Sequence, residues 1–296
     1  MALRDIRRRI KSVKNTSQIT KAMELVASSK MRKAQQRALA GKPFAKLFNE
    51  IIKAMRGRVE ESEHPYLVHR PVKKELVLMI STNRGLCGGL NVNLTREALT
   101  FPAETTGFVS LGKKGTQAIV RAKRNLVADF ERKENFTFLD AKHISEFLIE
   151  RFKSGEYDRV SVLFTNFINT LTQKPMVKQI LPINNLNMIA GVHDHTHEEQ
   201  VSTDIEKVDS TVEFKFEPNP EVVLDETLPY YVHFMVYQTM LEAEASEHSA
   251  RMVAMKSATD NAKQLIKDLT LDYNRKRQAS ITNEILEIST AQAAMN

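Results

Sequence analysis

The chain has very little cysteine: Cys87 is the only one in 296 residues. A single thiol cannot form an internal disulfide, and it excludes every metal site built from several cysteines. This composition fits a reducing compartment, so the cytoplasm is the expected location. No apolar run approaches the roughly 18 to 20 residues of a membrane-spanning helix, and the N-terminus lacks the apolar core of a secretory signal. With 42% hydrophobic residues, the sequence predicts a soluble protein of one or two domains.

Acidic residues are scarce in the first 60 positions, which hold 16 Lys and Arg against four acids, a balance of +12. The rest of the chain carries 27 basic and 32 acidic residues, or −5, so the positive charge is local to the N-terminal segment. Three interpretations stay open: a solvated helix face, a surface complementary to an acidic protein partner, and a stripe that binds nucleic acid.

Proline and glycine are nearly absent from both ends of the chain. Residues 3–56 contain only Gly41 and Pro43, which are expected to interrupt or bend a helix whose apolar face begins with Ile6 and Ile10. After Pro229 neither residue type occurs, so we expect a second helix from Tyr230 to about Thr290, roughly 90 Å long. Its seam is expected at Val232, Val236, Met240, Ala243, Ala250, Val253, Ala258, Ala262, Leu265, Leu269, Ile281, Ile285 and Ile288. Each helix is too amphipathic to stand alone, and the sequence therefore predicts an antiparallel coiled coil of the N- and C-terminal helices.

The middle of the chain predicts a Rossmann-like α/β domain, because apolar runs typical of buried strands alternate with helical segments. Such alternation favours a mostly parallel sheet with covering helices. The expected strands are 75–81, 107–111, 126–130, 159–165 and 176–183, and the expected helices are 118–123 and 141–152. The resulting organisation is an N-terminal coiled-coil helix at 1–58, an α/β globular domain at 74–212, and a C-terminal helix at 213–296 that pairs with 1–58. Within it, residues 184–212 are expected to be a loosely ordered connection.

A glycine-rich turn at Gly85, Gly88 and Gly89 follows the first strand, where backbone amides can hold phosphate. Its spacing is neither G-x-G-x-x-G nor that of a P-loop, and the stretch from Gly112 to Gly115 lacks the preceding glycine that a P-loop needs. These glycines, and the Cys87 thiol between them, are therefore interpreted as parts of a tight structural turn. No cofactor is expected.

Other candidate chemical groups are sparse. His193, His195 and His197 alternate along the chain and could line up on one side of an extended segment as metal ligands, although a solvated loop is the interpretation we favour. The adjacent carboxylates of Glu198 and Glu199 lie in polar surroundings rather than in an apolar cleft, so no catalytic acid/base pair is expected.

The end of the C-terminal helix carries more polar residues than a plain coiled coil needs. One interpretation is a solvated helix surface. The other is that this end lies inside another protein, where forked Arg donors and short polar side chains make directed contacts. The residues concerned are Arg251, Arg275, Arg277, Gln278, Thr282 and Glu284.

Five motifs in order resemble those of the gamma subunit of F-type ATP synthases of the bacterial type. They are NTSQITKAMELVASSKMRK at 15–33, STNRGLCGGLN at 81–91, FINT at 167–170, ARMVAMKSATDN at 250–261 and RQASITNEILEI at 277–288. The resemblance implies a central stalk, whose coiled coil threads a head of three alpha and three beta subunits. It further implies that the α/β domain meets the membrane rotor ring of c subunits, and that the chain is not itself catalytic.

The resemblance also implies partner contacts for individual residues. Contacts with the beta subunit are expected from Met23, Arg251, Arg277, Gln278, Thr282 and Glu284, and contacts with the c-ring from Phe216 and Glu217. A flank of the α/β domain would bind the epsilon subunit, and the membrane would be met only through the c-ring. The chain would then lie at the cytoplasmic face of the bacterial inner membrane, since no targeting extension precedes the first helix.

Two other functions are weighed against this one. A basic coiled-coil adaptor that binds nucleic acid or an acidic protein would use the N-terminal helix and, on nucleic acid, would bind less tightly as salt rises. A dinucleotide-binding enzyme with helical oligomerisation arms would use the glycine turn. Neither function requires the motif at 277–288, and we expect no nucleic-acid partner.

Overall fold

A computed structural model of the protein describes residues 3–41, 43–44, 47–48, 64–68, 70–183 and 216–295. The chain forms two compact units. The helix-pair unit comprises Met1–Ser29 and Arg251–Asn296, and the sheet unit comprises Lys30–Ala250. Two long helices, α1 (Leu3–Ala40) and α6 (Pro220–Met295), each contribute to both units.

The sheet unit contains five strands in the order β3-β2-β1-β4-β5. Their bounds are Glu75–Ile80 for β1, Thr106–Leu111 for β2, Asn125–Phe130 for β3, Arg159–Phe167 for β4 and Gln173–Leu181 for β5. The first four strands are parallel and β5 is antiparallel to β4. The mostly parallel sheet predicted from the alternating pattern is confirmed, and β5 begins three residues earlier than expected.

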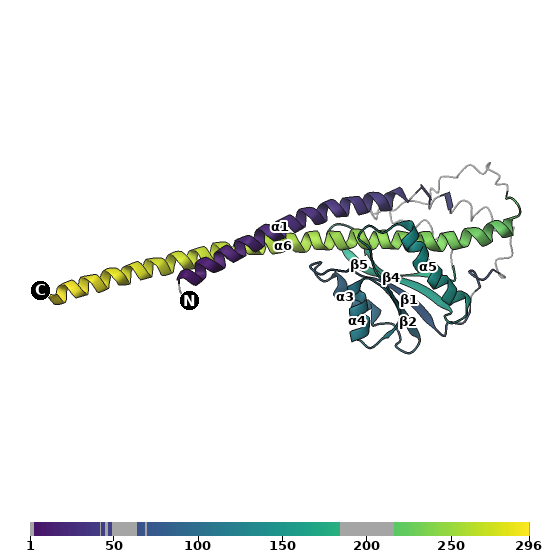
Figure 1. Ribbon diagram of the computed structural model, residues 1–296, viewed down its shortest axis with the longest axis horizontal. Coiled ribbons are helices and arrows are strands. Elements are labelled where there is room, and N and C mark those ends of the chain that lie inside the picture. Colours follow the sequence, from purple (N-terminus) through teal and green to yellow (C-terminus); the bar gives the residue numbers. More distant parts are fainter. Residues whose placement is uncertain are drawn as a thin grey trace, which may run out of the picture. The chain divides into compact units, whose positions relative to one another are not determined.

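Helices cover both faces of this sheet (Figure 1). On one face α3 (Leu90–Ala98) and α4 (Lys113–Arg121) bury Leu94 and Ile119 against Val77 and Phe108. On the other face α5 (Phe138–Lys153) and the first part of α6 pack on the alternate side chains of the same strands, in a larger core. Because neighbouring side chains on a strand point to opposite faces, β1 supplies both cores.

The start of α6 corrects one prediction. The helix begins at Pro220 and continues through Pro229, ten residues before the expected start at Tyr230. A proline inside a helix costs about 3 kcal/mol. Leu224 and Leu228, one helical turn apart, are buried in the core of the sheet unit, and burying a leucine contributes about 1.5 to 3 kcal/mol. Packing therefore outweighs the local preference of proline.

The start of α4 also differs from the sequence prediction, which placed this helix at 118–123. The helix begins at Lys113, directly after Gly112, whose φ of 106° is the left-handed conformation that favours glycine. A Cβ at Gly112 would lie 2.5 Å from the Ser81 carbonyl oxygen. The glycine therefore lets α4 start close to the end of β1.

The helix-pair unit is held by a narrow antiparallel seam, in which the Thr20 and Thr259 hydroxyls lie 2.7 Å apart. Buried and half-buried positions alternate three and four residues apart on both helices, the spacing of a left-handed coiled coil. They are Ile6, Ile10, Val13, Ser17, Thr20, Glu24 and Ala27 on α1, and Met255, Thr259, Ala262, Ile266, Leu269, Tyr273 and Lys276 on α6. The predicted coiled coil is thus confirmed.

Part of the predicted seam is wrong. Leu265 is 39% exposed, and the seam position beside it is taken by Ile266. Ile281, Ile285 and Ile288 are exposed because α6 continues past the N-terminal end of α1, where no partner helix covers it (Figure 1). The expected loose connection at 184–212 and its three histidines lie outside the described residues.

Candidate partner-binding surfaces

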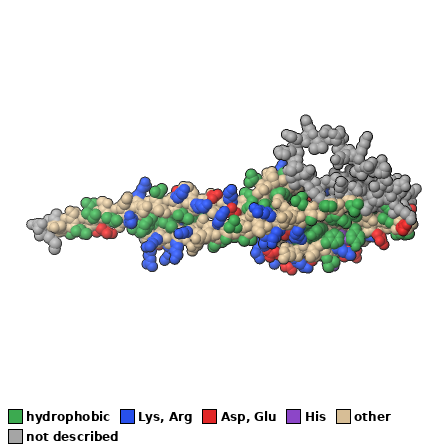
Figure 2. Space-filling model, turned by 90° about the horizontal axis from the view of Figure 1, so that it is seen from above, with side chains coloured by type: hydrophobic (Ala, Val, Ile, Leu, Met, Phe, Trp, Pro, Cys, Tyr) green, Lys and Arg blue, Asp and Glu red, His purple; other side chains and the backbone are tan. Residues whose placement is uncertain are grey.

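The N-terminal half of α1 presents a basic surface. Six basic side chains between positions 4 and 14 are exposed, and none forms a salt bridge within the described part of the chain. Figure 2 shows Lys and Arg side chains along the helix pair, with apolar side chains between them. Solvent-exposed cations without internal ion pairs remain available to an acidic surface. The six residues are Arg4, Arg7, Arg8, Arg9, Lys11 and Lys14.

The structure separates the predicted beta-subunit contacts into two groups. Met23 and Arg251 are half-buried in the helix pair, three residues from Thr20 on α1 and eight residues from Thr259 on α6, respectively. The second group begins 26 residues further along α6, at Arg277, which corresponds to roughly 40 Å of helix at 1.5 Å per residue. A single loop of a partner cannot reach both groups, so they describe two separate contact levels.

The second group lies where α6 has no partner helix. Gln278 and Thr282 are exposed one turn apart, and the Thr282 hydroxyl donates to the Gln278 carbonyl oxygen at 3.0 Å. Glu284 is also exposed and accepts a 3.2 Å hydrogen bond from the Ser280 hydroxyl. These side chains are interspersed with exposed isoleucines. A helix end with this mixture is typical of a surface that another protein covers.

The predicted c-ring contacts lie in the sheet unit, just before the start of α6. Phe216 is half-buried and packs against the larger core, whereas Glu217 is exposed. The chain turns here through Pro218 and Asn219, whose side-chain oxygen accepts a hydrogen bond from the Val222 amide at 2.8 Å. This bond fixes the start of the helix, so the corner presents Glu217 from a defined position.

The glycine-rich turn is tied together by its own side chains. Asn91 donates to the Thr82 hydroxyl at 2.8 Å and to the Cys87 sulfur at 3.3 Å. The first amides of α4 also have partners, since Lys113 donates to Asn83 and Gly115 donates to the Ser81 hydroxyl. These amides, which could have bound an anion, donate hydrogen bonds to side chains of the same chain instead.

The strand order places a crevice at the carboxyl ends of β1 and β4, where the direction of the chain crossover reverses; α/β proteins usually bind ligands there. Helix α6 covers these ends in the sheet unit. The Ser246 hydroxyl donates to the Thr165 carbonyl oxygen at 2.8 Å, and Ser249 donates to Thr170 at 2.8 Å. The usual ligand position therefore receives a helix of the same chain.

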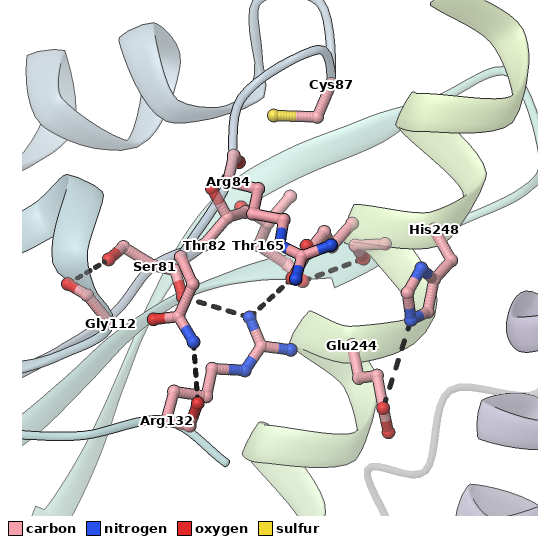
Figure 3. A network of polar contacts seen from close by, with 12 residues as sticks. Ser81, Thr82, Arg84, Cys87, Gly112, Arg132, Thr165, Glu244 and His248 are labelled. Carbon is pink, nitrogen blue, oxygen red and sulfur yellow. Dashed lines mark hydrogen bonds and ion pairs between the residues drawn. The ribbon is translucent and has the colours of Figure 1, made fainter. Parts of the chain in front are cut away.

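A buried ion pair lies at the same place and was not predicted from the sequence. Arg132, which follows β3, donates through Nη1 to Glu247 of α6 at 2.6 Å and to the Ser81 carbonyl oxygen at 2.9 Å. The side chains of Arg132 and Glu247 are only 7% and 11% exposed. Figure 3 shows Arg132 between the end of the sheet and the turns of α6 that carry Glu244 and His248. Removing one partner of such a pair typically costs about 3 to 5 kcal/mol.

The pKa of the neighbouring Glu244 carboxyl depends on its burial and on the arginines around it. Burial raises its pKa above the ordinary value, while the positive charges of Arg132 and Arg37 oppose the rise. Arg37 of α1 contacts Glu244 at 3.3 Å. The only sequence signal for this cluster was the presence of three acids at 242–247 in an otherwise apolar stretch of helix, because buried acids need partners.

Metal sites and membrane spans are also absent from the described residues. These residues contain no group of three or more His, Cys, Asp and Glu side chains that could hold a metal ion. Among them no helix is both long and apolar enough to cross a membrane.

The chain is similar, over nearly its whole length, to known chains of ATP synthases. The family model for ATP synthase matches residues 2–295. The ATP synthase gamma chain of Methylacidiphilum infernorum is 48% identical over 99% of this chain and 98% of its own length, and that of Opitutus terrae is 47% identical over 98% of each. Among solved structures, a chain of the Euglena gracilis mitochondrial ATP synthase has the same fold, with a TM-score of 0.67 at 20% identity over 99% of this chain and 94% of its own.

Proposed function

Because this chain belongs to the ATP synthase gamma chain family, we propose that it is the central-stalk rotor subunit of an F-type ATP synthase. In this role segments 1–58 and 213–296 form the shaft, and segment 74–212 forms the domain that meets the membrane rotor. The observation that carries the proposal is the uncovered end of α6. Residues 281–292 are all exposed, and four of them are Ile281, Ile285, Leu286 and Ile288. A helix of this composition needs a protein surface around it.

The head of three alpha and three beta subunits would provide that surface. Loops of beta would contact the uncovered end of α6 at Arg277, Gln278, Thr282 and Glu284. Other loops of beta would contact the helix pair at Met23 and Arg251. The basic face of α1 would meet an acidic loop of beta, since opposite charges favour such a contact and like charges oppose it.

The sheet unit would contact the membrane rotor. Phe216 and Glu217, just before the start of α6, would meet the ring of c subunits, and a flank of the α/β domain would bind epsilon. The chain would therefore be a peripheral protein at the cytoplasmic face of the bacterial inner membrane. It would serve ATP synthesis and the transport of hydrogen or other ions only as part of the complex.

In this mechanism the chain is not catalytic and changes the catalytic sites by turning. An asymmetric shaft presents a different face to each of three chemically identical sites, so each angle favours a different conformation and nucleotide affinity. Thr20, Ala27, Thr259 and Ala262 keep the seam of the helix pair narrow. A narrow shaft fits a narrow bore and does not bind strongly at any one angle.

Native mass spectrometry of the complex isolated from its membranes tests this proposal. A tag inserted near residue 195 leaves both ends of the chain unchanged. The expected assembly contains one copy of this chain with three copies each of two ATPase-type subunits. Recovery of the chain alone, or with nucleic acid, from well-preserved membranes would contradict the proposal.

A further inference from the structure

The loop between β3 and α5, residues 131–137, contacts both long helices within the sheet unit. Its first contact is with α6, through the buried pair of Arg132 and Glu247. Its other contacts are with α1, where Lys30 pairs with Glu134 and the Arg37 guanidinium donates to the Phe136 carbonyl oxygen at 2.7 Å. One short segment thus binds the two helices that carry the shaft.

Aromatic packing supports the same loop. The Phe136 ring lies edge-on to Tyr237 of α6, with ring centroids 5.9 Å apart, and the Arg37 guanidinium lies 4.9 Å from the centroid of the Phe136 ring. Arg37 also reaches Glu244 of α6. Phe136 is therefore enclosed by side chains from both helices, and the loop cannot shift along one helix without disturbing the other.

The loop is anchored to the sheet as well. The Asn83 side chain donates to the Arg132 carbonyl oxygen at 2.6 Å, and the Arg132 guanidinium donates to the Ser81 carbonyl oxygen. Both partners lie just after β1, the central strand of the sheet. The loop therefore links three bodies by directed hydrogen bonds: the sheet, α1 and α6.

Apolar packing and directed bonds constrain a helix differently. The first part of α6 is buried through side chains such as Val232, Val236 and Met240, and such contacts have no preferred direction. A charge-assisted hydrogen bond has a defined distance and angle, so it fixes the rotation of a helix about its own axis. Glu247 lies close to the end of the sheet unit, which closes at Ala250. The ion pair therefore holds α6 at the last turn that the sheet unit contains, together with the hydrogen bonds that Ser246 and Ser249 donate to the Thr165 and Thr170 carbonyl oxygens.

We propose that the loop 131–137 is the element that transmits torque between the α/β domain and the two helices, and that Arg132 is its positioning residue. This inference rests on the proposed rotor function. Without the loop contacts, the helices can turn slightly against the sheet under load, and part of each rotation is lost. The apolar core then keeps the protein folded while the coupling between ion flow and ATP becomes inefficient.

A pair of substitutions separates torque from stability. Arg132→Met alone leaves the Glu247 charge buried and destabilises the fold, whereas Arg132→Met with Glu247→Leu replaces the pair by apolar side chains, which often restores stability. Lys133→Gln is the matched control, because Lys133 lies in the same loop but pairs with Asp140 of α5 rather than with a long helix. Each variant is incorporated into the complex and placed in vesicles.

Two quantities are measured: the melting temperature of the chain, and the number of ions pumped per ATP hydrolysed by the complex. The double variant is expected to melt near the wild-type temperature and to pump measurably fewer ions per ATP hydrolysed than the wild type. The control is expected to match the wild type in both. A double variant that pumps at the wild-type ratio would overturn the inference, whatever its melting temperature. Failure of the wild-type chain to assemble with ATPase subunits would instead overturn the proposed rotor function.

Discussion

Helix α6 has two different environments along its length. Between residues 231 and 249, in the sheet unit, every side chain is buried or half-buried, whatever its direction around the helix. Between residues 255 and 280, in the helix-pair unit, most side chains are exposed and the covered ones form a stripe, and between residues 281 and 292 none is covered. The first stretch is stabilised by its own chain. The second stretch leaves most of its apolar and polar side chains exposed.

A core substitution in the sheet unit is expected to have the largest effect on the free energy of unfolding. Phe164→Ala removes a fully buried ring from β4 and is expected to lower the free energy of unfolding by about 3 to 5 kcal/mol. Ile285→Ala, in the uncovered end of α6, is expected to change it by less than about 0.5 kcal/mol. Urea unfolding of the isolated chain measures both. Similar losses for the two variants would mean that the end of α6 is buried within the chain itself.

A smaller effect is expected at the seam of the helix pair. Thr259→Val leaves the Thr20 hydroxyl without its 2.7 Å partner and is expected to cost about 1 kcal/mol, because a half-buried hydroxyl loses one hydrogen bond. Combining it with Thr20→Val removes both polar groups and is expected to recover most of the loss. A double-mutant cycle by thermal unfolding measures the coupling. Strictly additive losses would show that the two hydroxyls do not interact.

Acid is expected to weaken the sheet unit through His233. Burial lowers the pKa of this imidazole below 6.5, against the opposing charge of Glu146, and its Nδ1 lies 2.6 Å from the Ser145 hydroxyl. The unfolded chain therefore takes up this proton at higher pH than the folded chain. Stability from the neutral ring is present above pH 6.5 and is lost as the pH falls below it. Between about pH 7.5 and 5.5, the melting temperature should fall less for His233→Gln than for the wild type; an equal fall would remove His233 as a cause.

The smallest effect on the isolated chain is expected from the exposed polar residues of α6. Gln278→Ala should leave the free energy of unfolding within about 0.5 kcal/mol of the wild type, because its side chain is exposed. The same variant is expected to lower coupled turnover of the assembled complex. ATP hydrolysis and synthesis in vesicles provide the measurement. Unchanged rates would remove Gln278 from the proposed contacts with beta.

Periodicity predicted the elements of the fold well where one physical signal dominated. The apolar run of β1 and the absence of breakers after Pro229 indicated the central sheet and the long helix, because both signals are local. The sequence did not predict that α6 passes through Pro229, since the burial of Leu224 and Leu228 depends on a sheet that is distant in the chain. It also placed Leu265 in the seam, although Ile266, the next residue, takes that position and Leu265 is exposed.

Some residues of the candidate surfaces could be predicted from the sequence, and others could not. The residues at 277–284 were identified through family motifs, and the structure adds that they lie on an uncovered helix. The contact of Arg132 with Glu247 joins residues 115 positions apart, and no local pattern reports such a pair. Interactions of this kind become visible only when the topology brings the end of β3 beside α6.

The central claim is that the uncovered end of α6 becomes enclosed when the complex forms. Because Cys87 is buried and is the only cysteine in the chain, Ile285→Cys introduces a single reactive thiol at a side chain that is 60% exposed. Thiol labelling is compared between the isolated chain and the assembled complex. Rapid labelling of the isolated chain and strong protection in the complex is the predicted result. Equal labelling in both states would contradict the claim.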